Sequence, residues 1–228
     1  MLSIVLPVLD EAATIAQALQ RLQPLRSRGA EVIVVDGGST DATIERARPL
    51  ADHVETAPRG RAVQMNAGAA RARGEALLFL HADTVLPDAA DRHIAAALDG
   101  GASWGRFDVR IEGTHPMLAV VAWSMNLRSR LSGIATGDQA MFVRRETFDA
   151  AGGFPDIALM EDIALSRALK RRGRPACLRQ QVTTSGRRWQ KHGVFRTIVL
   201  MWRLRLAYFL GADPSDLAVR YGYRPARR

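Results

Sequence analysis

Cysteine and lysine are almost absent from this 228-residue sequence, which has one cysteine, Cys177, and carries its positive charge almost wholly on arginine. A single cysteine excludes an internal disulfide framework and a cysteine-rich metal site. We therefore expect the protein in the reducing cytoplasm, with attachment at the inner face of a membrane as an alternative.

Long hydrophobic runs are also lacking, and no stretch reaches the roughly 20 apolar residues that a transmembrane helix requires. The longest candidate, residues 194–210, is interrupted by Arg196, Arg203 and Arg205. Residues 1–7 have no basic segment before their apolar residues, so they predict a strand and not a signal peptide.

The net charge is +9, with 47% hydrophobic and 24% charged residues. These fractions are ordinary for a globular protein, and the length predicts one domain. The charge favours an anionic partner, such as a nucleotide, a phosphorylated substrate, nucleic acid or an acidic membrane surface. An arginine-rich genomic composition explains the same charge equally well.

Short apolar runs alternate with helical spacing through the first half of the chain. Strands are predicted at residues 2–8, 31–38, 52–57 and 75–82, and helices at residues 11–22, 40–50, 61–73 and 87–98. Continuous apolar strands that alternate with helices predict an α/β fold with a Rossmann-like, mostly parallel central sheet and helices on both faces.

The second half is less regular. It predicts a strand with one exposed face at residues 103–113, a helix at 117–131, a loop and strand at 137–148, a helix at 160–172 capped by Gly173, and a long helix at 194–210 before a short tail.

Polar residues follow three of the predicted strands: Asp10-Glu11, Asp36-Gly37-Gly38 and His81-Ala82-Asp83. A lone aspartate after a strand is usually a turn residue or a helix cap. Because parallel α/β sheets bind ligands beyond the carboxyl ends of their strands, three such ends at one edge indicate a binding site.

Five segments in this order carry a resemblance: IVLPVLDEAATIAQAL, VIVVDGGSTDAT, GRAVQMNAGAARARGEALLFLHADT, GDQAMFVRRETFDAAGGF and LMEDIALSRALKRRG. Together they resemble family 2 glycosyltransferases with the GT-A fold, from Leu2 to about Trp189. The likeness is strongest to the compact bacterial branch with HADT and MED motifs, whose members are often labelled arsenosugar-biosynthesis glycosyltransferases.

The resemblance implies one GT-A domain over residues 1–228. Residues 1–100 form its nucleotide-sugar-binding half, 101–190 its acceptor and catalytic half, and 191–228 a C-terminal helical segment. It implies an inverting enzyme that moves a sugar from a nucleotide-diphosphate sugar, by family frequency a UDP sugar, to the hydroxyl of a small-molecule or lipid-linked acceptor.

The resemblance places the nucleotide beside two strand ends. Asp36 and Gly38 belong to a DDGS-like motif in which the first aspartate accepts from the nucleobase; the alternative for Asp36 is a strand-to-turn residue. Pro7, Leu9 and Glu11 match a segment beside the nucleoside, although Glu11 could equally be a first-turn helix acid.

Arginine suits phosphate because its guanidinium is planar and offers several donors. Arg61, in a segment with Arg59, Gly60, Gln64 and Asn66, is the candidate for a nucleotide or diphosphate contact. The nearby Arg71 and Arg73 are expected in solvent.

His81-Ala82-Asp83 occupies the position of the family's DxD motif. The resemblance makes Asp83 the ligand of a divalent cation, Mn²⁺ or Mg²⁺, which take oxygen ligands. His81 replaces the first aspartate and could bind Mn²⁺ or hydrogen-bond the sugar. Thr84 is expected to begin a turn.

Glu161-Asp162 opens a predicted helix, and the resemblance makes Asp162 the general base that takes the acceptor's proton. The alternative for Asp162 is a helix N-terminal charge. Glu161 could orient the base, bind an acceptor hydroxyl or be an exposed helix acid.

The acceptor is expected to meet Gly137, Asp138 and Gln139, whose polar groups suit sugar hydroxyls. A lid-like segment with Arg187, Arg188 and Trp189 is expected to meet the diphosphate and the sugar. For Trp104 and Trp123, core packing is favoured over stacking on a sugar.

Two other functions are weighed. A sugar-phosphate nucleotidyltransferase usually has a glycine-rich, basic N-terminal loop, whereas residues 7–11 are acidic. A non-catalytic binder of nucleotides or anionic surfaces fits the charge, but no nucleic-acid-binding motif is present and no nucleic-acid partner is expected. Burial or homodimerisation is favoured for helix 194–210, with peripheral membrane contact as the alternative.

Overall fold

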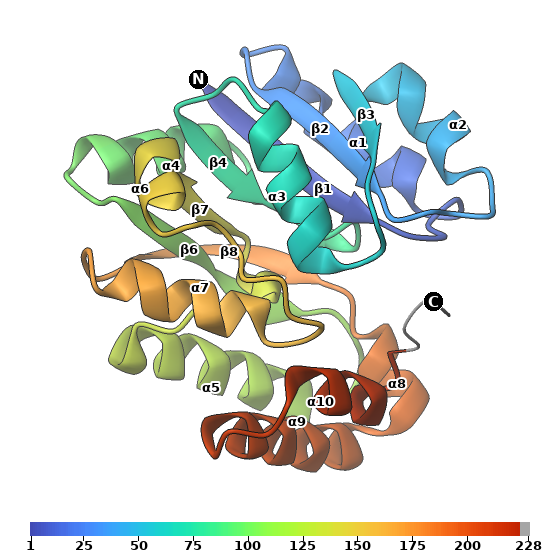
Figure 1. Ribbon diagram of the computed structural model, residues 1–228, viewed down its shortest axis with the longest axis vertical. Coiled ribbons are helices and arrows are strands. Elements are labelled where there is room, and N and C mark those ends of the chain that lie inside the picture. The colour runs from blue at the N-terminus through green and yellow to red at the C-terminus, as the bar shows by residue number, and fades with distance from the viewer. Residues whose placement is uncertain (224–228) are drawn as a thin grey trace.

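One eight-stranded sheet organises the computed structural model, which describes residues 1–223 (Figure 1). The strands are β1 (Leu2–Val8), β2 (Glu31–Asp36), β3 (His53–Thr56), β4 (Ala76–Phe79), β5 (Thr84–Val85), β6 (Trp104–Ile111), β7 (Met141–Arg144) and β8 (Ala176–Thr184). Their order is β3-β2-β1-β4-β7-β6-β8-β5. Only β7 and β5 run antiparallel to their neighbours, so the predicted mostly parallel sheet is confirmed.

Helices cover both faces of this sheet. They are α1 (Ile15–Arg26), α2 (Thr43–Ala47), α3 (Arg61–Arg71), α4 (Ala90–Asp99), α5 (Met117–Ser132), α6 (Arg145–Ala150), α7 (Glu161–Lys170), α8 (Arg187–His192), α9 (Val194–Phe209) and α10 (Pro214–Tyr221), with 3₁₀ turns at Arg48–Leu50 and Gly137–Gln139. Residues 224–228, the end of the predicted C-terminal segment, lie outside the described residues.

Successive side chains of a strand point to opposite faces of the sheet, and this explains why a layer of helices packs on each face. In β1, Ile4 and Leu6 join the apolar cluster under α1, α4 and α5, whereas Val5 joins the cluster under α3, α6 and α7. All three side chains are fully buried, and burying each one stabilises the fold by roughly 2 kcal/mol. The strands are apolar on both sides because both sides face helices.

Several expectations about the elements were wrong. Helix α1 begins at Ile15, so Glu11 precedes it and is not a first-turn helix acid. Helix α7 ends at Lys170, before Gly173. Trp104 is buried as expected, but Trp123 is 64% exposed.

Strand β6 was expected to have an exposed face, yet it is buried on both sides over most of its length. Its Arg106 is fully buried and donates to Asp108, to Ser129 Oγ (3.0 Å) and to the Asn126 carbonyl (3.1 Å). These partners allow a charged side chain to be buried. The register with β8 shifts between Phe107 and Asp108.

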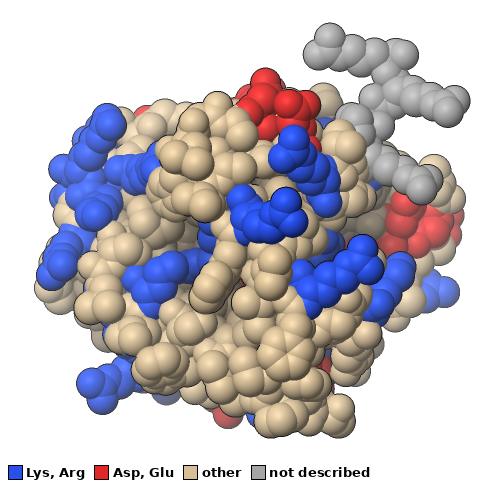
Figure 2. Space-filling view, turned by 90° about the horizontal axis from the view of Figure 1, so that it is seen from below, with Lys and Arg blue, Asp and Glu red and all other residues tan. Residues whose placement is uncertain are grey.

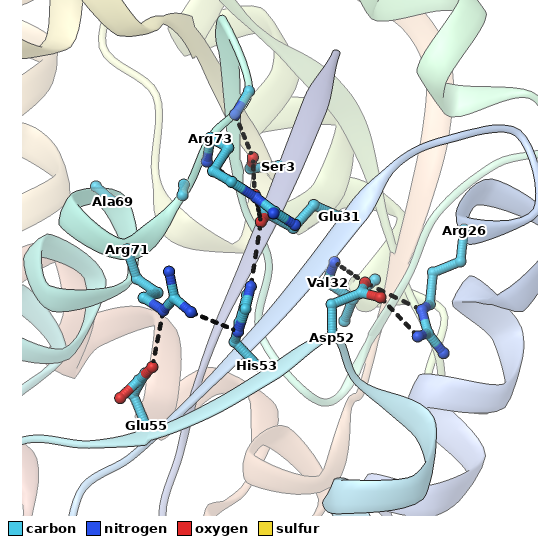
Figure 3. A network of polar contacts seen from close by, with 12 residues as sticks. Ser3, Arg26, Glu31, Val32, Asp52, His53, Glu55, Ala69, Arg71 and Arg73 are labelled. Carbon is cyan, nitrogen blue, oxygen red and sulfur yellow. Dashed lines mark hydrogen bonds and ion pairs between the residues drawn. The ribbon is translucent and has the colours of Figure 1, made fainter.

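A polar cluster joins the amino ends of β1 and β2 to the end of α3 (Figure 3). The buried Glu31 carboxylate accepts from Ser3 Oγ (2.6 Å) and from Nε of Arg73 (2.9 Å). Nearby, Arg71 pairs with Glu55 (3.1 Å). Arg71 and Arg73 are exposed, as expected, and each also pairs with a glutamate of the sheet.

Candidate functional site

A cavity of about 500 Å³ opens at the carboxyl ends of β1 and β4, whereas the Glu31 cluster lies at the amino ends of the strands. It is lined from the loops after these strands and from α3, α7, α8, α9 and α10. The predicted site residues that line it are Pro7, Leu9, Glu11, Arg61, His81, Ala82, Asp83, Asp138, Glu161, Arg188 and Trp189. Those outside its lining are Asp36, Gly38, Gly137, Gln139 and Asp162.

The pairing of the short edge strand β5 with the end of β8 places Asp83 beside the α8 segment. Thr84 does not begin a turn, as was expected, but starts β5, where it pairs with Thr184 at the end of β8. This pairing brings Asp83, just before β5, to within 3.8 Å of the guanidinium of Arg187, just after β8. The same guanidinium lies 4.0 Å from Glu11. One cation therefore bridges the acidic residues that follow β1 and β4.

The loops after β1 and β2 are joined by short polar side chains. Asp10 accepts from the Thr40 N–H (2.8 Å), and Ser39 Oγ accepts from the Asp10 N–H (2.8 Å). Asp41 accepts from the Ala12 N–H (3.1 Å). These bonds hold the strand ends in place, so Glu11 is presented on a fixed backbone.

Asp36 is buried at the end of β2, and its carboxylate is used within its own turn. It accepts from the N–H groups of Gly38 and Ser39 (2.8 Å each) and from the Ser39 hydroxyl. Gly38 has a φ of 92°, which favours glycine. The structure thus places both residues in a turn behind the cavity, and their predicted nucleotide contact stays a prediction.

The two amides of the α3 segment have structural roles. Gln64 donates to the carbonyls of Val8 (2.9 Å) and Val35 (2.8 Å), and so ties the end of β1 to β2. Asn66 exchanges two hydrogen bonds with the backbone of Phe154. Arg61, by contrast, is exposed and lines the cavity.

His81 lies against the loop that carries Asp138. A Cβ atom on Gly137 would lie 2.6 Å from the imidazole, so glycine is needed for this approach. Nδ1 of His81 is 3.6 Å from the Asp138 carboxylate. Desolvation opposes ionisation, but the contact with His81 lowers the pKa of Asp138 below its ordinary value. Asp138 is therefore a charged acceptor at the cavity wall.

Glu161 and Asp162 differ in how they are held. Asp162 accepts from the N–H groups of Gly137 (2.9 Å) and Ile163 (2.7 Å), whereas Glu161 lines the cavity and is 6% exposed. Burial, with the neighbouring charge of Asp162, raises the pKa of Glu161 to about 7. Burial also raises the pKa of Asp162. The pair can therefore hold or release a proton near neutral pH.

The expected acceptor contact of Gln139 was wrong. Its side chain is fully buried, accepts from the Thr136 N–H (3.2 Å) and donates to Asn126 (3.3 Å). An amide held in this way points into the protein and cannot meet a sugar hydroxyl.

Backbone strain gathers around the cavity. Among residues 1–223, the non-glycine residues with positive φ are Asp10 (52°), Ala89 (51°), Ala140 (47°) and Met160 (71°). Three of these four lie within three residues of Glu11, Asp138 or Glu161. Such strain persists where the surrounding structure holds a functional geometry, which supports a site here.

The C-terminal helix supplies a wall that the sequence reasoning missed. Tyr221 and Tyr223 line the cavity. Arg188 donates to the Tyr221 carbonyl (2.6 Å) and lies 3.6 Å from the centre of its ring, while Arg59 lies 5.0 Å from the ring centre of Tyr223. The RYGY segment offered aromatic residues beside arginine as a signal, but its sequence gives no indication of where it folds back.

The residues present fit a weak divalent-cation site. Among residues 1–223, no three His, Cys, Asp or Glu side chains gather in a metal-binding cluster. Asp83, however, keeps about one third of its side chain exposed in the cavity, and its charged partner Arg187 is itself 58% exposed. A hard cation could take one oxygen from Asp83 and the others from a diphosphate and water.

The profile of the family described as Glycosyl transferase family 2 matches residues 3–151. No curated protein matches the chain. Similar solved structures include Staphylococcus aureus TarS 1-349 with UDP-GlcNAc (19% identity, 81% of this chain and 58% of that chain, TM-score 0.65). Another is the mannosyltransferase PcManGT from Pyrobaculum calidifontis with GDP-Man and Mn²⁺ (21% identity, 97% of this chain and 69% of that chain, TM-score 0.64).

A third similar structure is the glucosyl-3-phosphoglycerate synthase from Mycobacterium tuberculosis with Mn²⁺, UDP and phosphoglyceric acid (22% identity, 81% of this chain and 69% of that chain, TM-score 0.58). The chain spans about 60% of the length of the TarS 1-349 structure. At these identities the likeness shows the fold, which is the predicted GT-A fold.

Proposed function

Because the chain belongs to glycosyl transferase family 2, we propose that it moves a sugar from a nucleotide-diphosphate sugar to an acceptor hydroxyl with inversion at the transferred carbon. The observation that carries this proposal is the cavity itself. It combines arginines from α3, from α8 and from the loop before α3 with the carboxylates of Asp83, after β4, and Glu161, at the start of α7. The donor that we propose is UDP-linked.

The arginines suit the donor diphosphate. Arg61 at the start of α3 and Arg188 in α8 line the same cavity, so a diphosphate there would have donors on two sides. Arg187 is held by weak contacts to Asp83 and Glu11 at 3.8 and 4.0 Å. It is placed to exchange them for a phosphate as the donor binds.

We propose Asp83 as the residue that holds a divalent cation, Mn²⁺ or Mg²⁺. When bound, the cation supplies positive charge against the negative charge that develops on the departing diphosphate. This assignment is supported by family neighbours crystallised with UDP and Mn²⁺, with UDP and Mg²⁺, and with GDP-Man and Mn²⁺. A UDP donor is supported by TarS structures with UDP-GlcNAc and with UDP.

The carboxylates of Glu161 and Asp162 supply a group that can take the proton of the acceptor hydroxyl. As the acceptor oxygen bonds to the sugar, the bond to the diphosphate breaks and the hydroxyl proton passes to a carboxylate. We propose Asp162 as this base: it lies outside the cavity lining but directly follows Glu161, which lines it, two backbone N–H groups hold it in place, and burial raises its pKa. Glu161 and Asp138, which line the cavity, are proposed to bind the acceptor beside it.

The test is a donor screen with product analysis. The protein is incubated with UDP-, GDP- and dTDP-linked sugars and Mn²⁺, with water as the acceptor of the sugar, and the released nucleotide is identified by chromatography. The proposal expects a nucleoside diphosphate from at least one donor and none from Asp83→Ala. Pyrophosphate released from a nucleoside triphosphate and a sugar phosphate, with no donor cleaved, would instead establish a nucleotidyltransferase.

A further inference from the structure

Helices α5 and α9 expose a continuous apolar stripe each. On α9 the exposed residues are Phe195, Val199, Trp202, Leu206 and Phe209, and on α5 they are Val120, Trp123, Leu127 and Leu131. The two helices contact each other and lie together at the lower edge of the molecule (Figure 1). We call this surface the α5–α9 face. Burial or homodimerisation was expected for helix 194–210; burial is only partial, since the buried residues of α9 are Val194, Thr197 and Leu204, and homodimerisation stays a prediction.

The charge on these helices has one sign. Neither α5 nor α9 contains an aspartate or a glutamate, whereas together they carry Arg128, Arg130, Arg196, Arg203 and Arg205. Seen from below, the protein has a broad region of uncharged residues with basic residues around it, and acidic residues lie only towards the margins of the view (Figure 2). Arg196 and Arg203 are exposed and lie next to the apolar stripe of α9.

This combination selects between two occupants of the α5–α9 face. A second copy of the chain would set arginine against arginine around an apolar seam, with no carboxylate on either helix to pair with them. A bilayer with anionic headgroups would take the apolar side chains between its lipids and the arginines at its phosphates. Trp123 and Trp202, 64% and 72% exposed, are the residue type that anchors proteins at membrane interfaces.

We propose that the α5–α9 face docks on the surface of an anionic bilayer. The contact is peripheral, since none of the helices in residues 1–223 is long and apolar enough to cross a membrane. Thr197 and Met201 of α9 line the cavity, so docking would place the cavity opening close to the lipid surface. The proposal does not depend on the reaction proposed above, because binding is measured without donor or acceptor.

The test is co-sedimentation with vesicles. The whole chain is mixed with vesicles of phosphatidylcholine alone or of phosphatidylcholine with about one third phosphatidylglycerol. We expect binding to the anionic vesicles that weakens as salt is raised, because salt screens surface charges. Each basic residue near such a surface strengthens binding roughly five-fold. The Arg196→Glu/Arg203→Glu variant should therefore bind at least about 20-fold more weakly, and Trp202→Ser should also bind more weakly.

The matched control is Arg21→Glu/Arg92→Glu, which changes the net charge equally at exposed residues of α1 and α4. It should bind within about three-fold of the wild type. Failure of the wild type to bind anionic vesicles at low salt would overturn the proposal, as would an equal loss in the control. A dimer of the 25.0 kDa chain in light scattering that Trp202→Ser dissociates would assign the face to a second copy instead.

Discussion

Glu161 is the residue at which folding and the proposed chemistry conflict most clearly. Its carboxylate is 6% exposed, lines the cavity and has a pKa raised to about 7 by burial and by the charge of Asp162. Between about pH 4.5 and 7 the folded protein keeps a proton that the unfolded chain has lost. Stability therefore falls as pH rises through this range and levels off above it.

We predict that Glu161→Gln stabilises the protein at high pH, because it removes a charge that is costly to bury. The free energy of unfolding should increase by about 1–3 kcal/mol at pH 8 and by less than about 0.5 kcal/mol at pH 5. Denaturant titrations at the two pH values measure this. The control is Glu146→Gln, an exposed first-turn glutamate of α6, which should show no such pH dependence. Equal stabilisation at both pH values would contradict the account.

We predict that Asp162→Asn lowers the transfer rate by roughly 10²–10⁴-fold with little change in donor affinity, because it removes the base and leaves the donor contacts. The rate and the donor KM are measured with the same donor. In the wild type kcat/KM should fall as pH is lowered through the raised pKa of Asp162, because a protonated base cannot take the acceptor's proton. A variant with near-normal transfer would show that another group, Glu161 first, takes the proton.

Motifs identified residues that the structure places in the cavity lining, and the roles of these residues stay predictions. Asp83, His81 and Glu161 were all found this way. Gln139 was misplaced because its burial depends on a turn with Thr136 and on a contact with Asn126, thirteen residues away in α5. Neither partner can be identified from the letters around Gln139.

Among the elements, helix α10 lines one side of the cavity, which the sequence did not predict. Leu217 is fully buried in a small cluster with Met160, Ile163 and Leu204. The same helix ends at Tyr221, whose ring lies against Arg188. The packing of one leucine therefore holds an aromatic side of the cavity in place, and α10 connects the fold to the donor site.

We predict that Leu217→Ala destabilises the protein by roughly 2–4 kcal/mol, because it leaves a cavity beneath α10. It should also weaken donor binding as Tyr221 and Tyr223 lose their support. Val219→Ala on the same helix is the control, since Val219 is 60% exposed and its change should be within about 0.5 kcal/mol. Denaturation and donor titration of both variants measure the effects. Equal stability of the two variants would show that α10 packs differently.

The sequence predicted β1 to β4 with their helices, and also β6, β7, α5, α7 and α9, because each of these elements has a clear apolar pattern. Strand β5 has only two residues, and β8 carries polar residues on both sides, so neither has the alternating pattern that identifies a strand. Both exist because each pairs with a partner far away in the sequence. The contact between Asp83 and Arg187 depends on that pairing and could not be predicted.

For the whole molecule, ion pairs away from the cavity set the acid limit of stability. Desolvation raises the pKa of Glu31, but the hydrogen bonds from Ser3 and Arg73 outweigh it, so the pKa lies below its ordinary value. The hydrogen bond from Arg28 lowers the pKa of Asp91. Carboxyl groups of this kind contribute stability above their unfolded pKa and lose it as pH falls through the folded value. This dependence is opposite in sign to that of Glu161.

We predict that thermal stability is greatest at about pH 5–6, because it falls below that range as these ion pairs are protonated and above it as Glu161 ionises. Calorimetric scans from pH 3 to 9 measure the profile. Glu31→Gln should lower the denaturation temperature at pH 7 but have less effect at pH 3. A profile that rises steadily to pH 9 would contradict the assignment for Glu161.

The most direct test of the donor site is a thermal-shift measurement of the whole protein with nucleotide sugars, with and without Mn²⁺. A ligand at 100 times its Kd stabilises the folded state by about 2.7 kcal/mol. We predict that a UDP sugar with Mn²⁺ raises the denaturation temperature of the wild type and of Asp88→Ala, an exposed residue outside the cavity lining, but not that of Asp83→Ala. No shift with any nucleotide sugar, or the same shift in Asp83→Ala, would contradict the account.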